Sequence, residues 1–298
     1  MAGAERYSIY PGVINGGSLN LQQISGVDIS PGTSKAMIVP GGAIDTAAVP
    51  TVSADPSVTI TTDDLGTVLG GVSLTVGLAI SSASSFQFQQ REDQGIFSSS
   101  AVHHIITVQK GFLAISSITS NQDDEGGATC QLALTALYNG SVDPLVPTTA
   151  ALTSTPAFTG RYFHGPVYHN SSQVEGIIST TVNPGLVFTA RRVDGAVYPS
   201  VGAITLRQPT ITFTTLKTAA TGLANMFHQA ITSNLSVYFL KGVTSGTRVG
   251  DSTNIKISCT AGDWSQDTIS VSDNGDATVS ITVRPTSTLA VSTVSSNP

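Results

Sequence analysis

Histidines and an acidic cluster are the residues of this chain whose spacing could support chemistry. Of the five histidines, only His164 and His169 lie close enough in sequence to suggest a metal pair. Their spacing does not fit one helical face, and no Cys or carboxylate nearby completes a zinc set. The run Asp123-Asp124-Glu125 lacks the alternating ligands and terminal Glu of a calcium loop. The first pair is therefore expected in a loop or at a strand end, and the acidic run in a solvated hairpin.

No motif for a nucleophile, a phosphate or a dinucleotide is present in the sequence. Cys130 and Cys259 each lie in an apparent strand, which predicts two small core residues in a reducing compartment. We therefore expect a protein that is not an enzyme, with no catalytic, cofactor-binding or metal-binding residues and no cofactor.

The composition predicts a surface that neighbouring chains cover. Charged residues make up 11% of the 298 residues, against about 25% in a typical soluble domain. Net charge is −6, which argues against a protein that grips nucleic acid. Apolar runs stay well below the roughly 18 residues of a membrane span, and the N-terminus does not match a secretory signal. The sequence therefore indicates a soluble, unsecreted protein that makes no membrane contact.

Two segments of the chain repeat at a constant spacing. Pro31 and Pro184 stand 153 residues apart within similar Pro-Gly turns, and Pro56 and Pro209 repeat that spacing before Thr-rich strands. Beyond about Gly70 the spacing becomes 151 residues. This pattern predicts two diverged copies of one domain, residues 1–150 and 151–298, with a linker near 142–160 and a C-terminal arm.

At this second spacing His103 corresponds to Asn254, and an apolar strand follows each of them. Because catalysis would not tolerate the exchange of His for Asn, the pair predicts a hydrogen bond that fixes the start of the strand.

Within each copy the hydrophobic period is two, which is typical of half-buried strands. Asn15-Gly16 and Asp194-Gly195 are turn signals between such strands. Residues 63–69 and 216–223 break the pattern at corresponding places and predict a short helix in each copy. The expected fold is all-β, with two tandem β-sandwich or barrel domains that each carry one short helix.

Two strand-rich stretches carry a resemblance to a known family. They are residues 103–111 with the later strand at 128–137, and residues 246–257 with the later strand at 277–283. In pattern, each copy resembles the tube domain of the tail tube (major tail) proteins of long-tailed bacteriophages. The resemblance implies a virion protein, assembled in the host cytoplasm, whose rings stack into a conduit for DNA. It also implies homotrimeric rings with pseudo-sixfold symmetry and contacts with other tail proteins.

Two sets of residues are predicted to serve such an assembly. An acidic lumen wall would keep passing DNA from sticking, and its candidates are Asp63, Asp64, Asp123, Asp124 and Glu125. The segments after the two Pro-Gly turns are expected to form long hairpins or loops that contact the next ring, with the candidates Lys35, Met37, Val39, Arg191 and Arg192.

Other functions remain open at this stage. A tail terminator, a baseplate component or a head decoration protein would show the same pattern. A receptor-binding, adhesin-like fibre would also be rich in β-strands, but the aromatic content of 6% does not favour glycan stacking. A glycan depolymerase would need two carboxylates across a groove, which sequence cannot place.

Overall fold

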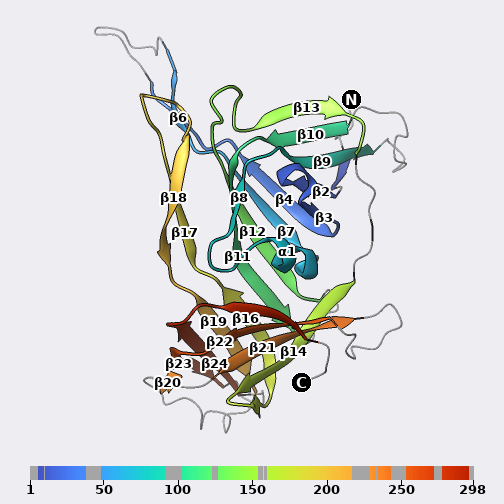
Figure 1. Cartoon of the computed structure of the whole chain (residues 1–298), viewed down its shortest axis with the longest axis vertical. Coiled ribbons are helices and arrows are strands. Elements are labelled where there is room, and N and C mark those ends of the chain that lie inside the picture. The colour runs from blue at the N-terminus through green and yellow to red at the C-terminus, as the bar shows by residue number, and fades with distance from the viewer. Residues whose placement is uncertain are drawn as a thin grey trace.

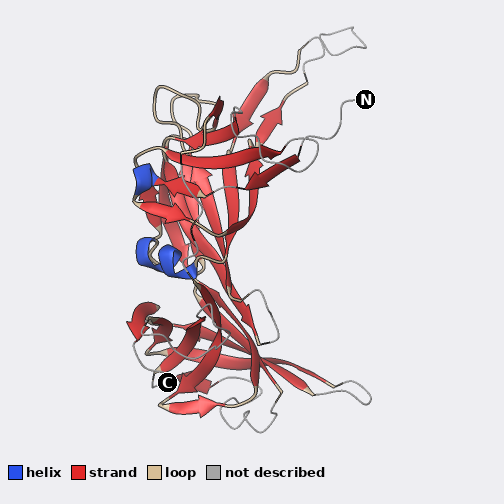
Figure 2. Ribbon diagram, turned by 90° about the vertical axis from the view of Figure 1, so that its right-hand side faces the viewer, coloured by secondary structure: helices blue, strands red, loops and turns tan. Residues whose placement is uncertain are grey.

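The chain is all-β, as predicted, with strands that pair antiparallel throughout (Figures 1 and 2). The computed structural model describes residues 6–9, 11–37, 48–91, 103–122, 127–153, 157, 160–216, 229–231, 234–242, 253–271 and 277–294. Within these ranges the helices are α1 (Leu65–Gly71) and the 3-10 turn η1 (Asn15–Gly17). No helix in the described ranges is long and apolar enough to cross a membrane.

The first half, residues 1–150, contains two sheets and a hairpin. One sheet has the order β13-β10-β9-β2-β3, and the other contains β11-β12-β7-β4. In addition, β1 pairs with β9, β8 pairs with β11, and the hairpin consists of β5 and β6. The strands are β1 (Arg6–Ile9), β2 (Gly12–Ile14), β3 (Leu19–Leu21), β4 (Ile24–Ser30), β5 (Thr33–Lys35), β6 (Thr51–Ala54), β7 (Ser57–Thr62), β8 (Leu78–Ile80), β9 (Ser84–Arg91), β10 (His103–Val108), β11 (Gly111–Asn121), β12 (Thr129–Ala136) and β13 (Val146–Ala150).

The second half, residues 151–298, shows the same arrangement. One sheet has the order β25-β22-β21-β14-β15, the other contains β20-β23-β24-β19-β16, and the hairpin consists of β17 and β18. The strands are β14 (Arg161–His169), β15 (Ser172–Val174), β16 (Ile177–Asn183), β17 (Leu186–Arg191), β18 (Val201–Arg207), β19 (Thr210–Thr215), β20 (Gln229–Ile231), β21 (Leu235–Gly242), β22 (Asn254–Cys259), β23 (Gly262–Ser270), β24 (Thr278–Pro285) and β25 (Ala290–Val294).

The strand pairing of the two halves corresponds in register and in its irregularities. The β4–β7 pair has a bulge that begins at Ile24, and the β16–β19 pair has one that begins at Ile177, 153 residues later. The bulge of β11 begins at Ile115 and that of β23 at Gln266, 151 residues later. We call residues that hold the same place in this pattern equivalent.

Alternation of apolar and polar residues explains why corresponding strands form. In β7 and β19 every second side chain is buried, and both strands end on a buried threonine, Thr62 and Thr215. Their inward residues join one apolar core that includes side chains from both sheets of each half. The predicted Asn-Gly and Asp-Gly turns are confirmed, because Asn15 and Asp194 both have positive φ and precede a positive-φ glycine.

Two terminal segments differ from their predicted roles. Residues 146–150, inside the expected linker, form the edge strand β13 and pair with β10. Pro147 fits there because an edge strand does not need every N–H. Residues 290–294, inside the expected C-terminal arm, form β25 and pair with β22 in the equivalent place. Of the helix predicted at 216–223, all residues except Leu216 lie outside the described ranges, so this expectation stays a prediction.

Candidate assembly surfaces

The two histidines considered as a metal pair make separate contacts within the fold. His164 is buried, with its Nδ1 3.1 Å from Ser120 Oγ. His169 instead lies against the indole of Trp264, with ring centroids 4.7 Å apart, and burial lowers the pKa of its imidazole. Among the described residues, no group of three His, Cys, Asp or Glu side chains could hold a metal ion.

The two cysteines and the pair His103 and Asn254 are buried, as the following contacts show. Cys130 and Cys259 are free and buried, and burial raises the pKa of both thiols, that of Cys259 to about 11. Asn254 is fully buried, and its Oδ1 accepts a hydrogen bond from Lys241 N at 3.0 Å, which confirms the predicted bond at this strand start. His103 is also buried at the equivalent position.

The two halves join edge to edge in one continuous sheet. Strand β11 of the first half pairs antiparallel with β16 of the second, with Ile118 opposite Val182 and Ser120 opposite Thr180. All four side chains are buried. The sheet therefore runs through both halves, from β20 at one end to β4 at the other.

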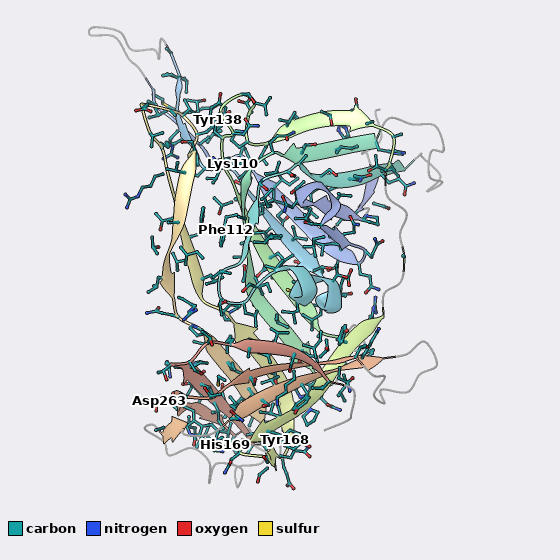
Figure 3. All side chains as sticks on the ribbon, in the orientation of Figure 1. Lys110, Phe112, Tyr138, Tyr168, His169 and Asp263 are labelled. Carbon is teal, nitrogen blue, oxygen red and sulfur yellow. The ribbon has the colours of Figure 1, made fainter. Side chains whose placement is uncertain are left out.

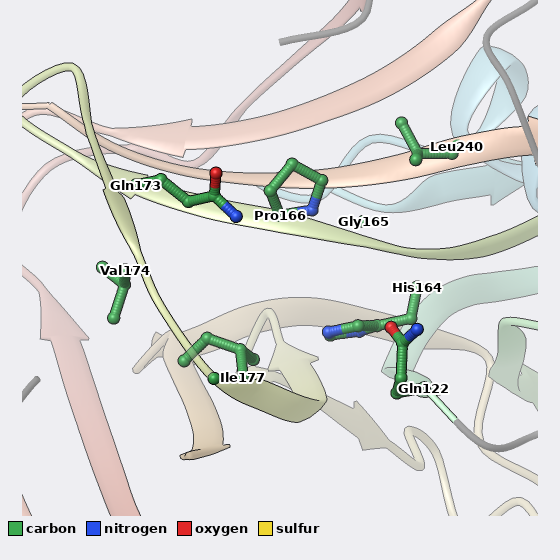
Figure 4. Close-up of a pocket in the computed structure, with 9 residues that line it drawn as sticks. Gln122, His164, Gly165, Pro166, Gln173, Val174, Ile177 and Leu240 are labelled. Carbon is green, nitrogen blue, oxygen red and sulfur yellow. The ribbon is translucent and has the colours of Figure 1, made fainter. Parts of the chain in front are cut away.

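A pocket of about 320 Å³ lies beside this junction (Figure 4). Apart from His164 its lining residues are not ionisable, and His164 already contacts Ser120. The lining consists of Gln122, His164, Gly165, Pro166, Gln173, Val174, Gly176, Ile177 and Leu240.

The hairpin β17–β18 leaves the second half and runs alongside the first (Figure 1). The ring of Phe188 stacks on that of Phe112, with centroids 4.3 Å apart and an interplanar angle of 12°. Nearby, Lys110 Nζ donates a hydrogen bond to Ser200 O at 2.8 Å, and Tyr138 N donates one to Pro199 O at 2.8 Å. Figure 3 shows Lys110, Phe112 and Tyr138 on the first half beside this hairpin. The hairpin is therefore held by apolar and polar contacts within the chain.

The predicted inter-ring residues divide into two groups. Arg192 is engaged within the chain, since it pairs with Asp55 and donates a hydrogen bond from Nη2 to Ala54 O at 3.3 Å. Lys35, at the end of β5, and Met37 are exposed. Arg191 is exposed at the end of β17. Val39 lies outside the described ranges.

The predicted lumen carboxylates Asp63 and Asp64 both have partners within the chain. Asp64 is buried and accepts a hydrogen bond through Oδ2 from Gln22 N at 3.1 Å. Asp63 Oδ2 lies 3.6 Å from Arg161 Nη2, and the Asp63 side chain is 15% exposed. Asp64 is therefore too buried to line a wall, whereas the lumen role of Asp63 stays a prediction. Asp123, Asp124 and Glu125 lie outside the described ranges.

In the long sheet, β4 and part of β23 each have an edge without a partner in the part of the chain that the structure describes. Strand β4 ends the long sheet, since it pairs with β7 alone. Strand β23 is covered by β20 at residues 262–264 only, so its edge from Ser265 onward is open. Beside that open part, Ile269 and Val271 are 50% and 72% exposed. Sequence reasoning missed these edges because their residues look like ordinary strand residues.

Comparisons with protein families and with curated proteins give no match. No protein-family model matches the chain, and no curated protein is detectably similar to it in sequence.

Proposed function

We propose that this chain is a structural, non-enzymatic subunit that assembles with its own copies into stacked rings, and that it is the major tail tube protein of a long-tailed bacteriophage. Its two halves would be diverged copies of one tube domain. Its place would be the virion, after assembly in the host cytoplasm, in contact with other tail proteins and with DNA that passes through without specific binding.

The edge-to-edge junction between the halves carries this proposal. Two units of equal strand order are joined by β11 of one and β16 of the other, so different edges meet. A contact between different surfaces can repeat indefinitely, and it closes into a ring when its rotation allows. The resemblance to tail tube proteins implies rings of six tube domains, and since each chain would supply two of them, three chains would complete a ring.

The charge balance supports a conduit for DNA. DNA carries one negative charge about every 1.7 Å along its axis, and a row of lumen cations would hold it through counterion release. The chain has 19 acidic and 13 basic residues, an excess that suits a wall over which DNA slides. An acidic inner wall therefore remains part of the proposal, with Asp63, Asp123, Asp124 and Glu125 as its candidates.

Mass measurement and negative-stain electron microscopy of the purified protein test this function together. We expect assemblies whose mass is a multiple of three times the 30.6 kDa chain, and images of rings or tubes with a central channel. Single rings that never stack would instead favour a terminator, baseplate or decoration protein. A monomer at all concentrations would contradict ring assembly.

A further inference from the structure

The junction inside the chain specifies a second junction between chains. In the first half, β11 uses its edge at Ile118–Asn121 to pair with β16. The equivalent part of the second half is the end of β23, which pairs with β24 on one side and has no partner among the described residues on the other. The strand equivalent to β16 is β4, which is also unpaired on its outer edge. Each chain therefore presents both surfaces of the contact that its halves already make.

We propose that β4 of one chain pairs antiparallel with the end of β23 of a second copy, in the register of the β11–β16 junction. This inference rests on the proposed function and specifies its ring contact. Shifting Ile118 and Val182 to their equivalents places Ile269 opposite Ile29 of the next copy. Shifting Thr119 and Thr181 in the same way gives the expected neighbouring pairs, Ser270 opposite Asp28 and then Val271 opposite Val27.

The burial of side chains supports a missing strand at both edges. At the internal junction Ile118 and Val182 are fully buried. Their equivalents are only partly covered, because Ile269 is 50% exposed and Ile29 is half-buried. Exposed β-branched residues at an open sheet edge invite strand addition, and a second copy in this register would cover them.

A second, independent surface has complementary charge. The hairpin β5–β6 is equivalent to β17–β18, since both have a bulge at the same place, which makes Lys35 the equivalent of Phe188. Asp263 is the equivalent of Phe112, because they pair with Ala230 and Ala79 at matching positions. A Phe-Phe stack within the chain thus corresponds to a Lys-Asp pair between chains.

These two charges are available for such a contact. Lys35 is exposed, and Asp263 is half-buried on the second half, where Figure 3 labels it well below Phe112. Neither residue takes part in an ion pair within the described ranges. When β4 of one copy meets β23 of the next, the hairpin that follows β4 is carried toward Asp263 of that copy, as β17–β18 is carried to Phe112.

Charge reversal tests the hairpin contact. We expect Lys35→Asp and Asp263→Lys each to raise the dissociation constant of the assembly roughly tenfold, because attraction becomes repulsion. The double variant Lys35→Asp/Asp263→Lys should recover most of the loss, since the pair is restored with its signs exchanged. Asp143→Lys changes an exposed carboxylate in a loop of the first half by the same charge and serves as the matched control. Equal losses in single and double variants would reject this pair.

Disulfide trapping tests the strand register in the full chain. Asp28→Cys/Ser270→Cys should form disulfides between chains on mild oxidation and give linked trimers on a non-reducing gel. The buried Cys130 and Cys259 should add little background, since thiols with raised pKa react slowly. Asp28→Cys/Thr268→Cys is the control, because a shift of two residues moves the thiols roughly 7 Å along the strand.

The outcomes separate this inference from the proposed function. Wild-type protein that assembles, with trapping at 28/270 and not at 28/268, supports both. Wild-type rings without trapping and without charge rescue would overturn the strand contact while the ring remains. Linked dimers with twofold symmetry would also overturn it. A wild-type protein that stays monomeric would reject the ring and this contact together.

Discussion

The hairpins of the two halves have the same strand pairing but differ in the residue that each presents to a neighbouring unit. In β17–β18 this residue is Phe188, which stacks on Phe112 within the same chain. In β5–β6 the equivalent residue is Lys35, which is exposed. A contact within one chain forms at high effective concentration and can be apolar. A surface that stays exposed until a second chain binds avoids nonspecific association when it is charged, since exposed apolar patches associate without specificity.

Substitutions at an equivalent core position of each half test whether both halves have a packed core. Trp264 is fully buried in the second half, and its equivalent in the first half is the fully buried Leu113. Trp264→Ala should lower the free energy of unfolding by about 3–5 kcal/mol, and Leu113→Ala by about 2–5 kcal/mol. Urea unfolding followed by circular dichroism measures both. Trp264→Phe should cost less, because the indole Nε1 has no hydrogen-bond partner in the described structure. A loss below about 1 kcal/mol for Trp264→Ala would contradict a packed second core.

The turns that start the two hairpins offer a second matched pair. Gly32 and Gly185 have φ of +57° and +62°, and a Cβ at either would lie 2.2 or 1.9 Å from the carbonyl oxygen of Asp55 or Gln208. Alanine at either glycine should cost more than about 3 kcal/mol, since left-handed strain and a backbone clash combine. Gly195→Ala is the control. With φ of +71° and no atom within 4 Å, it should cost only about 1–2 kcal/mol. Unequal losses of stability at Gly32 and Gly185 would show that the two turns are not structurally equivalent.

The Phe112–Phe188 stack that holds the hairpin β17–β18 can be replaced by a Lys-Asp pair, as proposed for the hairpin β5–β6. Phe188→Lys should release β17–β18 from the first half, because a charge replaces the stack on Phe112. Hydrogen exchange of amides 186–207 should then quicken roughly tenfold, which corresponds to about 1.4 kcal/mol. Phe112→Asp/Phe188→Lys should slow the exchange again. Val187→Ala, at a neighbouring residue that is 46% exposed, serves as the control and should change little. No recovery in the double variant would argue against a Lys-Asp pair at the equivalent site.

Much of the fold could be predicted because strands and turns leave local signals. Alternation in β7 and β19 predicts their buried faces, and Asn15-Gly16 predicts a turn that only a left-handed backbone allows. Strand β13 was missed because prolines and threonines at an edge strand resemble a linker.

The partner of a strand edge left no such local signal. Ser120 and Thr180 read as ordinary strand residues, and only the folded sheet brings them together at the junction. Asp64 was assigned to a lumen wall as part of an acidic pair in the sequence. Its burial depends on the backbone of Gln22, which is distant in sequence.

The smallest expected effect is a pH dependence of stability that comes from His169 in the second half. His169 packs on Trp264, whereas the residue at the equivalent place of the first half is Ile14, which does not titrate. Burial lowers the pKa of His169 below its ordinary value of 6.5. The unfolded chain therefore binds a proton more readily, so the contribution of neutral His169 is present above pH 6.5 and is lost as pH falls below it. Urea unfolding between pH 8 and pH 5 should show wild type losing slightly more stability than His169→Gln, with the difference at pH 8 as baseline. Parallel curves would show that His169 ionises as freely in the folded protein as in the unfolded chain.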